Sequence, residues 1–343
     1  MADIEILSNF YPFKGMKKMY ERNNYPYANC TYTSLLTIGS YFNKSILPIL
    51  NNVIFIYRFN KEKVQSKGYF RLEVVNIKPT ETLLEDIGIL VNAKSPDIFN
   101  LKEEIMDSIS RGCPLSICID LFYQKGRIFY YNKQHGPHSL LVYGYDGMKD
   151  EVYTVDDIDE YKEYTVPFTE FENYCKVPAQ YPDFNYYFEY YLKPDKNNLQ
   201  PRDLSHLYIS DYISSMLEHE DEIIDSLKSI SYMADSYEYL INNEDLIETL
   251  SSTIYRKCSD KYRLVTLFKY NLDVINVSSE LQNIMDNVID GWMFLRALSA
   301  KAIYSQKFNS EVYNTCIHTL KNIYENEQEY NEILFSMLKA WKA

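Results

Sequence analysis

The sequence predicts an α+β protein in which a domain with an antiparallel sheet, residues 1–195, precedes a helical domain, residues 196–343. Two observations support this division. Up to about residue 192, short apolar segments with period-two alternation are separated by turn residues, as in paired strands. Beyond the polar, proline-flanked segment 193–202, apolar residues recur at intervals of three and four, as on the buried faces of helices.

Helices and strands alternate along the first domain. After a lead-in over residues 1–23, an apolar run that starts at Cys30 predicts a helix. Further helices are expected over 82–90 and from Leu101 to Gly112, and a short strand followed by a helix over 165–175. The remaining strands are predicted over residues 46–59, 69–77, 115–120, 126–131, 139–145, 151–155 and 186–192. Asp146-Gly147 has the residues of a hairpin turn between the strands 139–145 and 151–155.

The second domain shows three long helical stripes of apolar residues. We interpret these stripes as core packing rather than as a cofactor site, since apolar stripes at this spacing are typical of helical bundles. Its histidines fall on separate predicted helices without a metal-ligand spacing, so we expect them to be structural. The stripes comprise Ile213, Met216, Leu217, Ile224, Leu227 and Ile230; then Leu281, Met285, Val288, Trp292 and Leu295; and finally Ile333, Leu334, Met337, Leu338 and Trp341.

Composition and charge exclude several kinds of partner. The chain has 343 residues, 46% of them hydrophobic, which is enough for a large core. Its net charge of −13 argues against binding nucleic acid or an anionic membrane. Six cysteines show no regular pairing and no metal spacing, and no apolar signal segment follows Met1. We therefore expect a cytoplasmic protein with reduced thiols, no metal and no cofactor.

Cys30 stands at the junction between a polar loop, held extended by Pro26, and the first predicted helix. Backbone N–H groups at a helix N-terminus lower the pKa of a thiol and make it nucleophilic at neutral pH. A free cysteine near a helix start is more often a small buried apolar residue. A catalytic role for Cys30 therefore depends on partners elsewhere in the chain.

His138 is the natural partner, because the tight loop from His135 delivers it to the start of the strand 139–145. A cysteine early on a helix and a histidine on a later strand are typical of papain-like thiol enzymes. His135 is the competing base. A carboxylate should orient the imidazole, and Asp156 and Asp157 follow the strand that pairs with this one. Successive strand residues face opposite sides, so at most one of them can face His138; a solvated acidic turn is the alternative interpretation.

Asn24 lies six residues before Cys30, where papain-like enzymes carry a glutamine that contributes to the oxyanion hole. An asparagine retains the amide donor on a shorter side chain. Tyr25 or Tyr27 could supply a hydroxyl donor instead. The oxyanion donor is thus left open among these three residues.

Four segments in this order resemble the N-terminal domain family of butirosin biosynthesis protein H, within the papain-like, C39-peptidase-like group: Tyr27–Tyr32, Ile119–Tyr123, His138–Asp146 and Tyr153–Ile158. The resemblance covers roughly residues 15–195. It implies a papain-like fold with Cys30 as nucleophile, His138 as base and Asp157, rather than Asp156, as the orienting carboxylate. Asn24 in place of glutamine and the second histidine, His135, depart from the family pattern.

The resemblance implies an acyltransferase or amide synthase of specialised metabolism. Such an enzyme takes an acyl group from the phosphopantetheine thioester of an acyl carrier protein onto Cys30 and passes it to an amine. The alternatives are a papain-like cysteine peptidase or amidase, which would use water as acceptor, and a non-catalytic binding module. Five cations could form a docking surface for an acidic carrier, with a solvated loop as the alternative: Arg58, Lys61, Lys63, Lys67 and Arg71.

Overall fold

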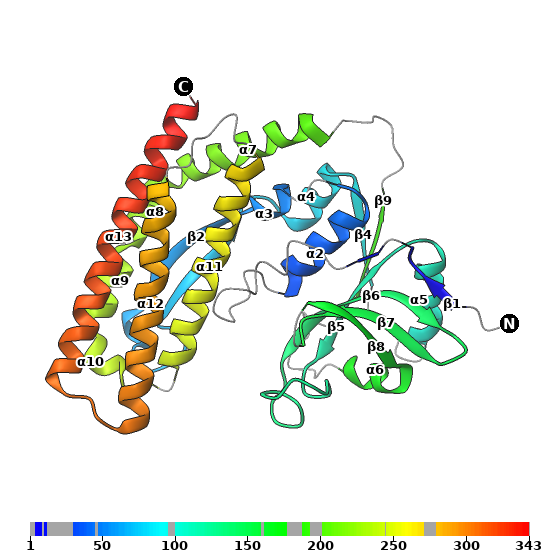
Figure 1. Ribbon diagram of the computed structural model, residues 1–343, viewed down its shortest axis with the longest axis horizontal. Coiled ribbons are helices and arrows are strands. Elements are labelled where there is room, and N and C mark those ends of the chain that lie inside the picture. Colours follow the sequence, from blue (N-terminus) through cyan, green and yellow to red (C-terminus); the bar gives the residue numbers. More distant parts are fainter. Residues whose placement is uncertain are drawn as a thin grey trace. The chain divides into compact units, whose positions relative to one another are not determined.

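The computed structural model describes residues 4–8, 10–11, 30–44, 47–94, 100–158, 161–176, 187–192, 201–243, 245–270 and 279–342. The chain divides into two compact units, which are considered separately below. The first contains most of the chain up to Ile49 together with Lys78–Ser205. The second contains Leu50–Ile77 and His206–Ala343. Together they give a mixed fold with a curled antiparallel sheet and C-terminal helices, as the α+β class predicts (Figure 1).

The first unit is built on a seven-stranded antiparallel sheet in the order β4-β9-β5-β6-β7-β8, with β1 also paired to β6. The central strand β6 is buried along most of its length, which explains its nearly continuous apolar sequence. Its register with β7 shifts between Val142 and Gly144. The strands are β1 (Ile4–Ile6), β4 (Ile89–Lys94), β5 (Leu115–Asp120), β6 (Pro137–Asp146), β7 (Glu151–Asp156), β8 (Lys162–Pro167) and β9 (Tyr187–Leu192).

Helices pack on this sheet through the apolar residues that predict them. Helix α2 (Cys30–Tyr41) contacts β6 and buries Leu36 and Ile38. Helix α5 (Leu101–Ser110) contacts β1, β5 and β6 through its four-residue apolar repeat, and Gly112, at a φ of 78°, follows its end. The shorter helices are α3 (Leu47–Leu50), α4 (Thr80–Asp86) and α6 (Phe168–Tyr174).

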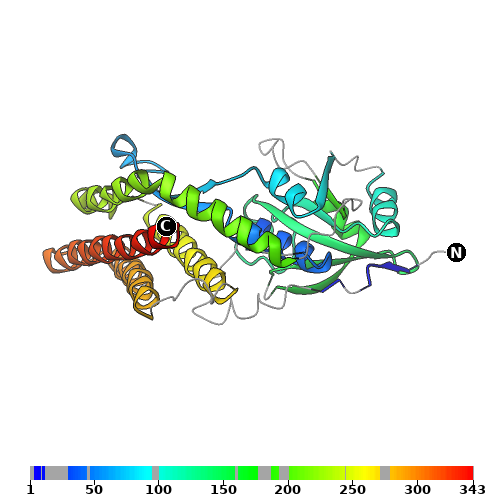
Figure 2. The ribbon, with the colours of Figure 1, turned by 90° about the horizontal axis from the view of Figure 1, so that it is seen from above.

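The second unit is a helical assembly around one hairpin, formed by β2 (Val53–Phe59) and β3 (Phe70–Asn76) with the 3-10 turn η1 (Lys61–Lys63) between them. Helices α8 and α9 contact β2, and α11 contacts β3. The long helices α11, α12 and α13 follow one another side by side, yellow to red in Figures 1 and 2. The helices are α7 (Pro201–Glu218), α8 (Glu220–Ser226), α9 (Lys228–Asp235), α10 (Tyr237–Leu240), α11 (Leu246–Tyr270), α12 (Ser279–Ser305) and α13 (Ser310–Lys342).

Four details differ from the sequence-based expectations. The helix expected over 82–90 ends at Asp86, and Ile89 and Leu90 begin the strand β4, which the sequence did not predict. The strand expected over 46–59 begins only at Val53, because Leu47–Leu50 form the short helix α3. The hairpin Leu50–Ile77 belongs to the helical unit, whereas a single boundary after residue 195 assigned it to the first domain. The predicted strand 126–131 is wrong, because these residues form turns. Gly126 has a φ of 91° and Ile128 and Phe129 are 75% and 84% exposed, so neither the backbone nor the side chains there fit a buried sheet. None of the helices within the described residues is long and apolar enough to cross a membrane.

Candidate active site around Cys30 and His138

Cys30 is the first residue of α2, as predicted. The hydroxyls of Thr33 and Ser34 donate to its carbonyl oxygen at 2.9 and 2.8 Å. Burial raises the pKa of the Cys30 thiol, but the hydrogen bond and positive charge of His138 and the backbone N–H of Ser139 lower it more. The net effect is a pKa below the ordinary value for a cysteine, which favours the thiolate.

His138 lies at the start of β6, where its backbone pairs with Ile119 of β5. The residue is only 6% exposed. Its Nε2 atom lies 2.7 Å from Oδ1 of Asp156, which leaves the other ring nitrogen, Nδ1, for Cys30. Burial lowers the pKa of His138, but the charge and hydrogen bond of Asp156, together with Cys30, raise it well above the usual range. The histidine and the cysteine thus favour each other's charged forms.

Asp156 ends β7 and is 2% exposed. Besides His138, its Oδ1 accepts hydrogen bonds from the backbone N–H of Asp157 at 2.7 Å and from Nη2 of Arg127 at 2.8 Å. The side-chain amide of Gln124 donates to its Oδ2. Burial opposes ionisation of Asp156, but His138, Arg127 and the Asp157 N–H outweigh it and lower the pKa to about 2. The carboxylate therefore stays ionised beside the imidazole.

The geometry favours Asp156, rather than Asp157, as the carboxylate that orients His138. Oδ1 of Asp157 lies 3.5 Å from Nε2 of His138, beyond the 2.7 Å of Asp156. Asp156 is the last residue of β7 and lies beside the start of β6, whereas Asp157 follows the strand and is turned toward Arg127. The assignment of Asp157 through the family resemblance is thus corrected. The expectation that one carboxylate of this pair lies beside His138 is met.

Arg127 and Gln124 belong to the same cluster, and the sequence reasoning missed both. Nη2 of Arg127 lies 2.9 Å from Nε2 of His138 and contacts both carboxylates, while its Nε donates to Oε1 of Gln124 at 2.9 Å. Both residues lie on the loop between β5 and β6, whose ends are joined by a 2.9 Å bond from Leu121 N–H to the Gly136 carbonyl. The turn residue Gly126 beside Arg127 is the one sequence signal for a loop here.

Arg127 also bears on whether this cluster holds a metal. One ligand atom from each of His138, Asp156 and Asp157 lies within 4.8 Å of the others, a spacing that a metal ion could use. The Arg127 guanidinium, however, contacts all three of these side chains. A metal would have to displace a cation that is bonded to both carboxylates and lies 2.9 Å from the imidazole Nε2, so the residues do not fit a metal centre.

His135, the competing base, is paired elsewhere. Its Nδ1 lies 2.6 Å from Oδ2 of Asp120, and its ring stacks on Phe122 with centroids 4.4 Å apart. Asp120 is 1% exposed and also accepts from the backbone N–H groups of Phe122 and Gly136. These contacts pair the imidazole of His135 with Asp120 and not with Asp156. Asn24, Tyr25 and Tyr27, the candidate oxyanion donors, lie outside the described residues.

Three of the five cations near the β2–β3 hairpin, Arg58, Lys67 and Arg71, are already paired with carboxylates. Arg58 bonds to Glu73 at 2.8 Å and to Glu222 at 2.6 Å. Arg71 shares Glu73 at 2.6 Å, and Lys67 lies 3.2 Å from Asp245. One nearby carboxylate, Glu73, and two that are distant in sequence, Glu222 and Asp245, thus offset much of the positive charge that the local sequence shows.

Comparisons with known proteins do not assign the chain to a family. The chain matches none of the family models against which it was compared, and a search of curated proteins finds no significantly similar sequence. What can be said of its activity therefore comes from the site itself and from the resemblance described above.

Proposed function

We propose that this protein is a cysteine-dependent acyltransferase or amide synthase with a papain-like catalytic domain. The observation that carries the proposal is geometric: Cys30 opens α2, and the buried His138 has its Nε2 2.7 Å from Oδ1 of Asp156. The pKa of the Cys30 thiol, which its hydrogen bond with His138 lowers, agrees with this arrangement. A thiol so activated suits acyl transfer, in which the enzyme forms a covalent intermediate. The packing of α2 on a central antiparallel strand that carries His138 near its start supports the papain-like assignment.

In the resting site, the thiolate of Cys30 would stand beside the protonated imidazole of His138. Asp156 stabilises that positive charge and fixes the ring, and Arg127 and Gln124 hold Asp156 in turn. Their role is positioning, because they contact the carboxylate and, for Arg127, the Nε2 side of the ring. The nucleophile is therefore ready before substrate arrives.

The reaction would proceed in two steps. The Cys30 thiolate attacks the thioester carbonyl, the carbon–sulfur bond to phosphopantetheine breaks, and the leaving thiolate takes the proton from His138. This leaves an acyl group on the Cys30 sulfur and a neutral imidazole. His138 then accepts a proton from the attacking amine, an amide bond forms, and the Cys30 thiolate leaves.

The donor and the acceptor in this proposal follow from the resemblance to the butirosin biosynthesis protein H family. The donor would be an acyl carrier protein thioester and the acceptor a small-molecule amine. With Arg58, Lys67 and Arg71 already paired, the β2–β3 cations give little support to a carrier docking surface at that hairpin. The carrier would be recognised at another surface.

Intact-mass spectrometry of the full chain mixed with an acyl-pantetheine thioester tests the chemistry. We expect one acyl group on Cys30, discharged to an amide when an amine is added. Cys30→Ala should abolish acylation. Cys118→Ala is a matched control, because Cys118 has intermediate burial like Cys30 and lies in the same unit.

The outcomes separate the candidate functions. Release of free acid at the same rate with and without amine would show that water is the acceptor, and cleavage of peptides without a carrier would make the protein a peptidase or amidase. If Cys30 reacts with iodoacetamide no faster than the other cysteines and forms no acyl adduct, the protein is a non-catalytic binding module.

A further inference from the structure

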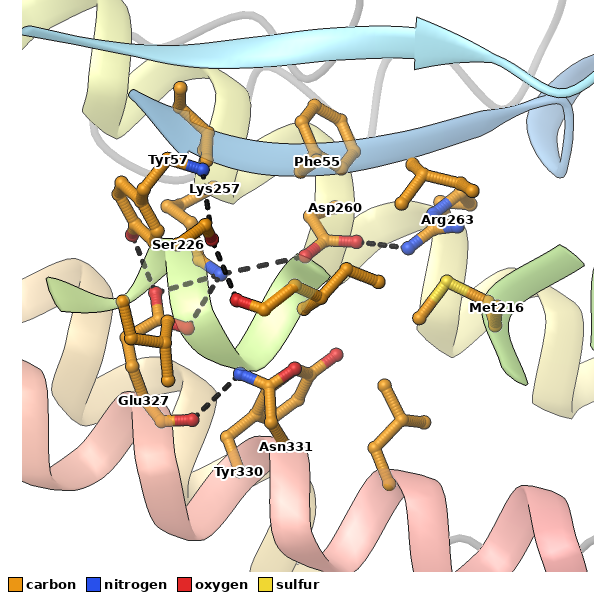
Figure 3. A pocket seen from close by; sticks show the side chains of 15 residues that line it. Phe55, Tyr57, Met216, Ser226, Lys257, Asp260, Arg263, Glu327, Tyr330 and Asn331 are labelled. Carbon is orange, nitrogen blue, oxygen red and sulfur yellow. Dashed lines mark hydrogen bonds and ion pairs between the residues drawn. The ribbon is translucent and has the colours of Figure 1, made fainter. Parts of the chain in front are cut away.

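The second unit contains a polar cavity between the β2–β3 hairpin and its helices. Its volume is about 30 Å³, above the roughly 10–15 Å³ that a single water requires. Side chains from α11 and α13 face each other across it, below β2 (Figure 3). The cavity lies in a different unit from Cys30 and His138, so it is no part of the site proposed above.

Four buried charged groups line this cavity. Lys257, Asp260 and Arg263 recur every three residues on one face of α11, and Glu327 comes from α13. Nζ of Lys257 lies 2.8 Å from Glu327 and 3.5 Å from Asp260, which also bonds to Arg263. The four residues are between 1% and 5% exposed. Such a network seldom stabilises a fold more than apolar residues of similar volume would.

Two hydrogen-bond donors in the cavity lack partners among the described residues: Nε of Arg263 and the hydroxyl of Tyr330. Arg263 is fixed by a 2.9 Å bond from Nη1 to the Val53 carbonyl and by packing over the Tyr212 ring at 4.9 Å. Burial raises the pKa of Tyr330 well above its ordinary value, so its hydroxyl keeps its proton. Buried polar groups are nearly always paired, and these two donors call for an acceptor.

The charges of the cavity restrict what that acceptor can be. Lys257 and Arg263 carry two positive charges, and Asp260 and Glu327 two negative ones, so the network is already neutral. An added anion would be buried without a counter-ion, which is unfavourable. An uncharged carbonyl oxygen, in contrast, accepts two hydrogen bonds and adds no charge.

We propose that this cavity binds a small uncharged molecule with a carbonyl oxygen, of the primary amide or urea class, which accepts hydrogen bonds from Nε of Arg263 and the hydroxyl of Tyr330. The aliphatic and aromatic residues between the charged groups, among them Phe55 and Met216, would enclose its apolar part. Binding here is independent of acyl transfer at Cys30.

The test is a titration of the full chain with acetamide, followed by ligand-observed NMR, with acetate as the charged isostere. We expect saturable binding of acetamide and weaker binding of acetate. Tyr330→Phe removes one hydrogen bond to the ligand and should weaken acetamide binding about tenfold. Tyr69→Phe is the control, because Tyr69 is also a fully buried tyrosine of the same unit but does not line the cavity.

Three kinds of result would overturn the proposal. One is acetamide binding that does not saturate or is unchanged in Tyr330→Phe. Another is tighter binding of acetate than of acetamide, or a crystal structure in which ordered water alone occupies the cavity. The third concerns the ligand-free protein: deleting an unpaired hydroxyl should leave the Tm of Tyr330→Phe equal or higher, so a lower Tm would mean that the hydroxyl already has a partner in the protein.

Discussion

Replacing Asp156 by Asn should uncouple Cys30 from its histidine, whereas the same change at Asp157 should not. Asp156 lies 2.7 Å from Nε2 of His138 and 2.8 Å from Nη2 of Arg127. Without its charge, the imidazolium of His138 is less stable, so the pKa of the Cys30 thiol rises. Asp157 acts in the opposite direction, because its negative charge raises the Cys30 pKa. Asp157→Asn should therefore lower that pKa slightly.

The effect of Asp156→Asn on stability follows from the same contacts. Lowering the Asp156 pKa from 3.8 to about 2 corresponds to about 2 kcal/mol of unfolding free energy at neutral pH. The substitution also leaves Arg127 and His138 buried without their acceptor, so the total loss should reach about 3–5 kcal/mol. The side chain of Asp157 is 19% exposed, so Asp157→Asn should lower the free energy of unfolding by only about 1–2 kcal/mol.

The assay is the rate of iodoacetamide alkylation of Cys30 against pH, read by peptide mass spectrometry, with unfolding in urea alongside it. For Asp156→Asn the alkylation profile should move to higher pH, and for Asp157→Asn slightly to lower pH. The reverse pattern, with Asp157→Asn losing thiolate reactivity and Asp156→Asn retaining it, would show that Asp157 orients His138 and that the reasoning from geometry is wrong.

Three further predictions concern the cluster and its loop. Because the pKa of Asp156 is lowered, its contribution to stability is complete above pH 3.8 and is lost as the pH falls toward about 2. Urea unfolding should therefore show a smaller loss of stability over this pH range for Asp156→Asn than for the wild type, since Glu73, Asp150 and Glu170, whose pKa values are also lowered, contribute to the loss in both. Arg127→Gln leaves two carboxylates without their shared cation, so it should lower the free energy of unfolding in urea by about 3–5 kcal/mol. Arg111→Gln removes an exposed pair with Asp107 and should change this free energy by about 0.5 kcal/mol or less. Equal losses in the two variants would contradict the role given to Arg127. Gly126→Ala would place a Cβ 2.8 Å from Cγ2 of Ile158 at a φ of 91°, and should lower the Tm more than Gly68→Ala, where φ is also positive but the space is open.

Local patterns predicted much of the sheet and the start of the site. The period-two run of β5 and the four-residue repeat of α5 each reflect burial of one strand or one helix face, so their positions follow from the sequence. Cys30 at a helix start and His138 at a strand start were predictable for the same reason. A hairpin that brings a carboxylate beside His138 follows from the turn at Asp146-Gly147.

Contacts between distant segments could not be predicted in this way. Arg127 reaches Asp156 and Asp157 from a loop. Its position depends on the turn at Gly126, and residues in a turn show no hydrophobic periodicity from which their contacts could be predicted. The choice between the two aspartates depends on where β7 ends, which differs by one residue from the predicted strand end. The cations from Arg58 to Arg71 looked unpaired because Glu73 lies just beyond that segment and Glu222 is 164 positions from Arg58.

The discontinuous second unit has a consequence for how the chain is made. Residues 50–77 leave the ribosome well before residues 206–343, with which they pack. Until then, the apolar side chains of Ile54 and Ile56, each 1% exposed in the folded protein, are open to solvent beside an unpaired strand edge. A shortened protein that ends near residue 195 would carry this hairpin permanently uncovered. A fragment of the Cys30 unit meant to stay in solution therefore requires the removal of residues 50–77 as well as the C-terminal helices.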